Sequence, residues 1–288
     1  MRFMAIVGAL AIGAAGCGGD DETSSSTSSG QGSSDAAPSK LALELTGKGN
    51  NVSFTGPESV AAGVVEISLK SDVPGDGEHA AQLVRVDGEQ TFEEVDAAGD
   101  AWGDKGKPLA EWFHAVGGVT AQTGKTVTAT QVLEPGRYFA IDIGSDAKPT
   151  PSLEFEVTEG DSGELPETEA SVEMKEYSFA STGLKVGSQQ VLVENAGVEP
   201  HFIVGAPLAK GATAEDAKKF FQSEGESEGP PPADFENSFA TSVMEGGGKQ
   251  VVELDLKAGK YVFVCFIPDR AGGPPHVAKG MVSEVTVG

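Results

Sequence analysis

Residues 258–265 read Ala258-Gly259-Lys260-Tyr261-Val262-Phe263-Val264-Cys265, a small turn followed by a run of β-forming residues that ends on a cysteine. Earlier in the chain stands a similar stretch, Pro135-Gly136-Arg137-Tyr138-Phe139-Ala140-Ile141-Asp142. Both combine turn residues with the apolar run of a buried strand. Further matches precede them in the same order: Phe54 with Phe179, 66–69 with 191–194, His79 with His201, and 124–127 with 248–251. Ordered matches across about a hundred residues indicate two copies of one structural unit.

Short runs of β-forming residues recur between Gly, Pro, Asn and Asp in both copies, with the spacing of β-sandwiches. They predict strands at 64–69, 82–86, 126–132, 138–143, 153–157, 190–194, 202–204, 250–256, 260–266 and 282–287. Helical signals are few and predict helices at 92–98 behind Thr91, at 109–116 behind Pro108, and at 214–222 behind Thr213 with Asp216 in the capping-box position. We therefore predict an all-β chain of two sandwiches, at 41–160 and 171–288, joined by an acidic linker at 161–170.

The N-terminus has the order of a secretory signal. Met1-Arg2 precedes an apolar run at 3–15, which is too short to span a bilayer, and small residues follow. Ala14-Ala15-Gly16-Cys17 resembles the lipobox of bacterial lipoproteins, which implies a signal peptide at 1–16 and a lipid on the sulfur of Cys17. The alternative is an ordinary secretory signal with an incidental cysteine. Residues 17–40 are mostly Gly, Ser, Thr and Asp, which predicts a disordered tether and an extracytoplasmic, lipid-anchored protein at the cell membrane.

Charge and cysteine content narrow the function further. The net charge is -24, with 44 acidic against 20 basic residues, which argues against nucleic acid and against direct contact with anionic lipid. An acidic surface instead suits a partner protein with a basic docking patch. The chain has two cysteines, so a lipid on Cys17 leaves Cys265 without a disulfide partner. An unpaired cysteine in an oxidising compartment is a candidate thiolate ligand.

The second copy contains the donors of a metal site. His201 follows a proline, Cys265 ends the strand quoted first, and His276 and Met281 follow it. Two imidazoles, one thiolate and one thioether make the trigonal His₂Cys site with a weak axial Met, the blue-copper arrangement for moving single electrons. The thiolate and thioether stabilise Cu(I), whereas the imidazoles suit Cu(II).

These residues resemble the cupredoxin family across the whole second copy. Asn195-Ala196-Gly197 before Pro200-His201 resembles the turn that carries the first histidine of plastocyanins, and 259–265 resembles the cysteine-bearing strand. The segment 276–281 is similar to the type 1 copper loop of copper nitrite reductases. The resemblance implies tandem cupredoxin-like Greek-key β-sandwiches and one mononuclear type 1-like copper on His201, Cys265, His276 and Met281. Ten residues separate Cys265 from His276, a longer loop than in plastocyanin or azurin.

Copper nitrite reductases and multicopper oxidases have a histidine beside the type 1 cysteine that connects it to a catalytic copper. Here the neighbours are Val264 and Phe266, and the whole chain has four histidines, so we expect a carrier and not an enzyme.

In the first copy, Asp142 stands at the cysteine position, a residue near Lys148 at that of His276, and Leu153 at that of Met281. We expect no copper there, His79 as a turn residue that binds nothing, and His114 as a packing or surface residue of the predicted helix.

The leading hypothesis is a membrane-tethered, extracytoplasmic electron-transfer protein with copper in its second copy. One alternative is a protein that buffers or delivers copper without a redox partner. The other is a metal-free structural or interaction lipoprotein, with acidic loops such as 223–237 as its working surface.

Overall fold

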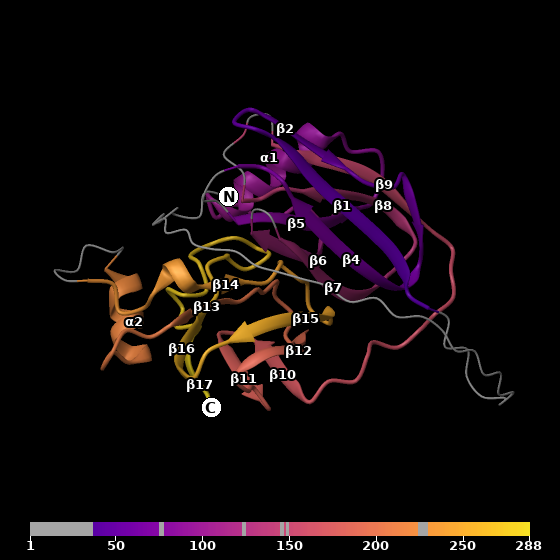
Figure 1. Cartoon of the computed structure of the whole chain (residues 1–288). Coiled ribbons are helices and arrows are strands. Elements are labelled where there is room, and N and C mark those ends of the chain that lie inside the picture. Colours follow the sequence, from indigo (N-terminus) through magenta and orange to yellow (C-terminus); the bar gives the residue numbers. More distant parts are fainter. Residues whose placement is uncertain (1–36, 75–77, 123–124, 145–146, 148–149, 224–229) are drawn as a thin grey trace, which may run out of the picture.

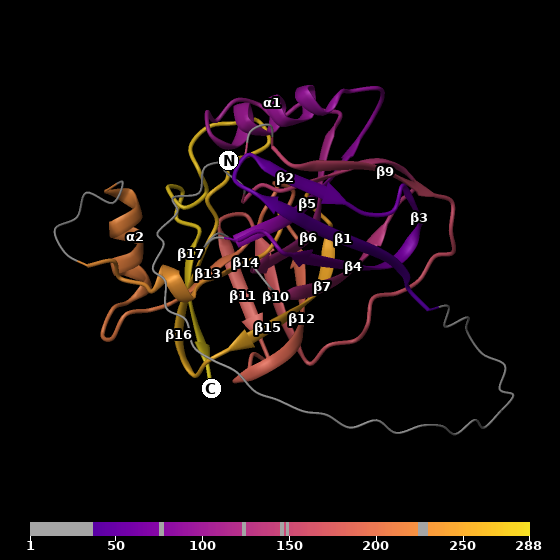
Figure 2. The same ribbon diagram turned by 45° about the horizontal axis from the view of Figure 1, so that its top comes forward.

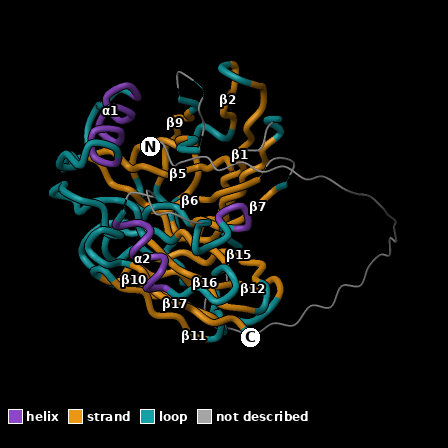
Figure 3. Tube along the Cα trace, turned by 90° about the vertical axis from the view of Figure 1, so that its left-hand side faces the viewer, coloured by secondary structure: helices purple, strands orange, loops and turns teal. Residues whose placement is uncertain are grey.

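The computed structural model describes residues 37–74, 78–122, 125–144, 147, 150–223 and 230–288. The predicted signal peptide, Cys17 and most of the tether lie outside these residues, as does Lys148. Two bodies of strands pack against each other, with the helices on the outside of the sheets (Figures 1 and 3). Neither helix of the described part is long and apolar enough to cross a membrane.

The first copy is a sandwich of two sheets with one helix, α1 (Phe92–Gly103), between β5 and β6. In spatial order, one sheet consists of β7 (Thr126–Leu133), β4 (Gly63–Ser71), β1 (Ser39–Lys48) and β2 (Asn51–Thr55). The other consists of β3 (Ser59–Ala61), β9 (Ser152–Thr158), β8 (Gly136–Ile141), β5 (Glu78–Val86) and β6 (Phe113–Gln122).

The second copy repeats this plan. One sheet consists of β11 (Ser178–Thr182), β10 (Ala170–Lys175), β12 (Gly187–Asn195) and β15 (Lys249–Leu256). The other consists of β14 (Phe239–Ala240), β13 (Val204–Pro207), β16 (Gly259–Val264) and β17 (Val282–Val287). Helix α2 (Ala214–Gln222) and the short 3₁₀ helix η1 (Phe235–Asn237) lie between β13 and β14.

The two copies have the same strand order. With the edge strand β3 left out, the strands of each copy form one sheet in the order 2-1-3-6 and a second in the order 5-4-7-8. In both copies the first and third strands pair in parallel. Because the chain crosses between the two sheets in this way, each copy is a Greek-key sandwich. The predicted all-β tandem fold is confirmed.

Local sequence explains most of these elements. Along β1 the buried side chains Leu41, Leu43 and Leu45 alternate with exposed ones, as a strand with one covered face requires. The capping box predicted for Thr213 and Asp216 is present before α2, and Thr91 forms a second one with Glu94 before α1.

The predicted helix at 109–116 is wrong, because residues from Phe113 onward form β6. Buried Phe113 and Ala115 alternate with the half-buried His114 and Val116, which is the period of a strand. Several boundaries also differ from the prediction: helix α1 extends to Gly103, beyond the predicted 92–98, and β10 begins at Ala170, inside the predicted linker. Strand β1 begins at Ser39, inside the predicted tether, and the strand predicted at 202–204 begins at Val204.

The two copies share one sheet. Residues 129–131 of β7 pair with 250–252 of β15, so the four-stranded sheets join into one of eight strands (Figure 2). The buried amide of Gln82 reinforces this junction, since it accepts from the Val243 N–H at 2.8 Å and donates to the Val243 carbonyl at 3.0 Å. Gln131 donates to the Val116 carbonyl at 2.6 Å within the first copy. Backbone and side-chain hydrogen bonds therefore hold the copies in one arrangement.

Replacing Gln82 tests this junction. Gln82→Ala leaves the buried N–H of Val243 without its partner and leaves the Val243 carbonyl with the Gly117 N–H alone, which should lower the free energy of unfolding by about 1–3 kcal/mol in urea titrations. Gln189→Ala is the matched control, since Gln189 lies near the start of β12 and its side chain bonds to the exposed Lys185 four residues earlier. Equal unfolding midpoints for the two variants would contradict the assigned role of Gln82.

Candidate metal centre

Neighbouring strands bring His201 and Cys265 together. Strand β13 pairs antiparallel with β16, with Val204 opposite Val264, so the residues just before β13 and just after β16 meet at one end of the sheet. The backbone of His201 is fixed by a reciprocal pair of hydrogen bonds with Met244, each 2.9 Å long. Both side chains are therefore carried on rigid backbone.

The long loop closes and returns His276 to the cysteine. The His276 N–H donates to the Ile267 carbonyl at 2.9 Å, and the Val277 N–H donates to the Cys265 carbonyl at 2.8 Å. The Met281 N–H then bonds to the His276 carbonyl at 2.9 Å, just before β17. These bonds place His276 beside the end of β16.

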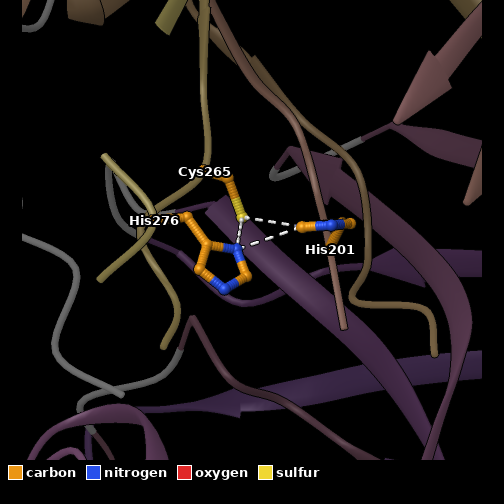
Figure 4. Close-up of side chains that lie close together, drawn as sticks. All are labelled: His201, Cys265 and His276. Carbon is orange, nitrogen blue, oxygen red and sulfur yellow. Dashed lines mark hydrogen bonds between the residues drawn. The ribbon is translucent and has the colours of Figure 1, made fainter. Parts of the chain in front are cut away.

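The donor atoms of the three side chains form a triangle (Figure 4). His276 Nδ1 lies 3.5 Å and His201 Nδ1 4.0 Å from Cys265 Sγ, and the two Nδ1 atoms are 3.0 Å apart. All three residues are fully buried. Among the described residues, this is the one group of three or more His, Cys and carboxylate side chains whose ligand atoms all lie within 4.8 Å of one another.

The triangle has the size of a metal site. The point equidistant from its corners lies about 2.1 Å from each, close to the ~2.0–2.1 Å of metal–nitrogen and ~2.3 Å of metal–sulfur bonds measured for zinc. Imidazole and thiolate together suit copper, and the three side chains lie as in a type 1 copper site. The structure thus brings together three of the four predicted ligands.

Met281 is fully buried in the same core cluster as Cys265. Its backbone is fixed by the bond from its N–H to the His276 carbonyl. Its role as the axial ligand stays a prediction.

Burial controls the protonation of the donors. It raises the pKa of the Cys265 thiol to about 12 and, with repulsion from His276, lowers the pKa of His201 to about 4. Burial also lowers the pKa of His276, although Asp269 opposes that effect. In the metal-free protein the thiol is therefore protonated and the imidazoles are neutral. Copper must displace the thiol proton to bind the thiolate.

Asp269 is a residue of the site that the sequence patterns did not identify. Its Oδ1 lies 2.9 Å from His276 Nε2 and accepts a 3.0 Å hydrogen bond from the Tyr177 hydroxyl, while Lys279 binds the carboxylate as well. Burial alone would raise the pKa of Asp269, but these donors lower it. An ionised carboxylate at Nε2 keeps the proton on that nitrogen and leaves Nδ1 free for a metal. The one signal in the sequence was an acidic residue in a loop otherwise rich in Gly and Pro.

A different pair occupies the equivalent position of the first copy. Gln82 pairs with Ile141 as Val204 pairs with Val264, so His79 stands at the position of His201 and Asp142 at that of Cys265. His79 Nδ1 lies 2.8 Å from the carboxylate of Asp142, which also accepts from the Ala80 N–H.

Both remaining histidines have carboxylate partners. His79 lies in strand β5, so its predicted place in a turn is wrong. His114 lies in β6, with its ring nitrogens 2.8 Å from Asp87 and 3.1 Å from Glu245.

No protein-family model matches the chain, and no curated protein matches it. Among solved structures it is similar to an auracyanin of Roseiflexus castenholzii, at 24% identity over 41% of this chain and 94% of that one, with a TM-score of 0.28. Auracyanin B matches at 20% identity over 44% and 92% of the two chains, with a TM-score of 0.28. A copper nitrite reductase of Nitrosomonas europaea matches at 13% over 86% and 93%, with a TM-score of 0.23. At such scores the case for copper depends on the side chains themselves.

The metal-free protein should lose stability between pH 6.5 and 4. Unfolded histidine takes up a proton near pH 6.5 but His201 in the fold only near pH 4, so the unfolded chain binds more protons in this window. The free energy of unfolding therefore decreases as the pH is lowered from 6.5 to 4. His201 accounts for at most about 3 kcal/mol of this decrease. Urea titrations at several pH values measure the loss, which should be smaller in His201→Gln. An equal loss in both proteins would contradict this account.

Proposed function

We propose that this protein is a membrane-tethered, extracytoplasmic electron-transfer protein with one type 1-like copper site in its second copy. The observation that carries the proposal is the buried triangle of His201, Cys265 and His276. Copper bound there would change between Cu(I) and Cu(II) and so carry one electron.

The chain's own residues suit this role because they hold one geometry. His201 is fixed by its backbone bonds to Met244, and His276 by its own backbone and by Asp269. Packing around Met281 and Cys265 leaves little room for movement of the donors. A site that moves little when its charge changes favours fast electron transfer.

Two observations favour a carrier over a copper enzyme. Val264 and Phe266 flank Cys265 and offer no ligand toward a second copper. The other two histidines of the chain are paired with carboxylates, His79 with Asp142 and His114 with Asp87 and Glu245.

Complete burial of the three donors favours electron transfer over copper delivery, since the ligands of a partner protein must reach a metal that is handed over.

Purified protein without its signal should show an intense visible absorption band with Cu(II), from charge transfer between the Cys265 thiolate and copper. Cys265→Ser replaces the thiolate with a hydroxyl and should abolish the band in absorption spectra. Met281→Leu should keep the band and change the reduction potential, because the axial ligand tunes it. Wild-type protein that gains no band with Cu(II) would exclude the type 1-like site.

The membrane attachment is tested separately. The lipobox-like Ala14-Ala15-Gly16-Cys17 and the polar stretch after it support a lipid anchor. In a bacterial host that processes lipoproteins, wild-type protein should sediment with membranes, whereas Cys17→Ala should lose the lipid and appear in the soluble fraction on immunoblots. The same distribution of both proteins would contradict the anchor.

The partner in this proposal is a redox protein with a basic docking patch. The net charge of -24 supports it, because opposite charges raise the rate of encounter.

A further inference from the structure

The ligand loop, residues 266–275, is held from outside by the first copy. The Trp102 indole N–H donates to the Asp269 carbonyl at 2.8 Å, and the Leu109 N–H donates to the Arg270 carbonyl at 2.8 Å. Trp102 belongs to α1 and is almost fully buried. Leu109 belongs to the connector, residues 104–112, between α1 and β6. Figure 2 shows the loop, in yellow, passing beside α1.

Arg270 is the main side-chain contact of the ligand loop with the first copy. One guanidinium nitrogen donates to the carbonyls of Ala110, Glu111 and Phe113 at 2.8, 3.1 and 2.9 Å. The other pairs with Glu245, which stands just before β15. A planar guanidinium can make these bonds at once, and the point charge of a lysine cannot.

The two backbones also touch, and the sequence has glycine where they do. The Gly273 N–H donates to the Gly106 carbonyl at 2.9 Å. A Cβ on Gly272 would lie 2.4 Å from that same carbonyl oxygen, and Gly272 has a φ of 85°, in the left-handed region that favours glycine. The loop and the connector are therefore shaped to fit each other.

Asp269 joins this contact to the candidate metal centre. Its carbonyl accepts from Trp102 of the first copy, and its carboxylate binds His276 Nε2. A displacement of the Asp269 backbone would move the carboxylate that orients the ring of His276. Asp269 thus connects the first copy to His276, a candidate ligand, through a single residue.

We propose that the first copy is a positioning domain for the copper site, and that Trp102 of the first copy and Arg270 of the ligand loop are the positioning residues. The inference rests on the proposed function, since it assigns the ligand-poor copy a role in that same site. Ten residues without a helix or a strand have many conformations open to them, and fixing one costs entropy. Contacts with the first copy offset that cost and hold His276 in the geometry that copper requires.

The test compares four variants of the chain without its signal: Trp102→Phe, Arg270→Ala, Arg270→Lys and, as the control, Arg137→Ala. Trp102→Phe removes one N–H and keeps an aromatic ring. Arg270→Lys keeps the positive charge and loses the planar guanidinium with its several N–H donors. Arg137 bonds to Glu154 and to the Gln90 carbonyl within the first copy. The measurements are the Cu(II) affinity and absorption band, the reduction potential, and amide hydrogen exchange of His276 and Val277 in the metal-free proteins.

We expect Trp102→Phe and Arg270→Ala to weaken Cu(II) binding about 10–100-fold, as loss of supporting contacts does in other metal sites. Their absorption band and reduction potential should shift, and the two loop amides should exchange faster. Arg270→Lys should fall between wild type and Arg270→Ala, and Arg137→Ala should match wild type.

An unchanged band, affinity and potential in Trp102→Phe and Arg270→Ala would overturn the inference, whether or not amide exchange changes. So would the same shift in Arg137→Ala. If wild-type protein shows no copper band, the proposed function fails by itself. Hydrogen exchange of the metal-free proteins then still decides whether the first copy holds the loop, and unchanged exchange would refute that contact role.

Discussion

The pairing of β13 with β16 is the constraint on which the candidate site depends. It brings together His201 and Cys265, which are 64 residues apart in the chain, at a place that excludes water. Exclusion of water makes the thiol hard to ionise and the imidazoles hard to protonate. A metal cation that binds there meets donors without competing solvent, and its own charge supplies the stabilisation that the buried thiolate otherwise lacks.

The first copy shows that the frame and the chemistry are separable. Its strands β5 and β8 have the same register as β13 and β16, yet they hold His79 and Asp142 as a buried pair. That pair needs no metal, because the His79 imidazole and the Asp142 carboxylate hydrogen-bond to each other. The carboxylate also accepts a hydrogen bond from the Ala80 N–H. One Greek-key frame thus supports a metal site in one copy and a closed polar contact in the other, according to the residues at the positions of Cys265, His276 and Met281.

The sequence predicted what local patterns determine. Turn residues followed by β-forming runs located β8 and β16, and Thr91 and Thr213 located the starts of α1 and α2. The order of His201, Cys265 and His276 identified the donors. The error at 109–116 arose because Pro108 and a short apolar run look alike before a helix and before a strand. Asp269, Trp102 and Arg270 were missed for a different reason. The contacts of Trp102 and Arg270 across the two copies join residues 157 to 167 positions apart, and no local pattern records such a contact. Asp269 meets His276 only seven residues away, but through the folded shape of a loop that has no periodic pattern.

The length of the ligand loop explains why the candidate site depends on both copies. A short loop after the cysteine can hold its histidine by its own turns, whereas ten residues rich in Gly and Pro need an external surface to select one conformation. The second copy alone offers the loop few partners for Arg270, whose guanidinium donates to three carbonyls of the first. The shared eight-stranded sheet and the Gln82 amide hold that surface in register with the loop. The first copy, which lacks the thiolate, therefore forms part of the surface that holds the ligand loop at the candidate metal centre.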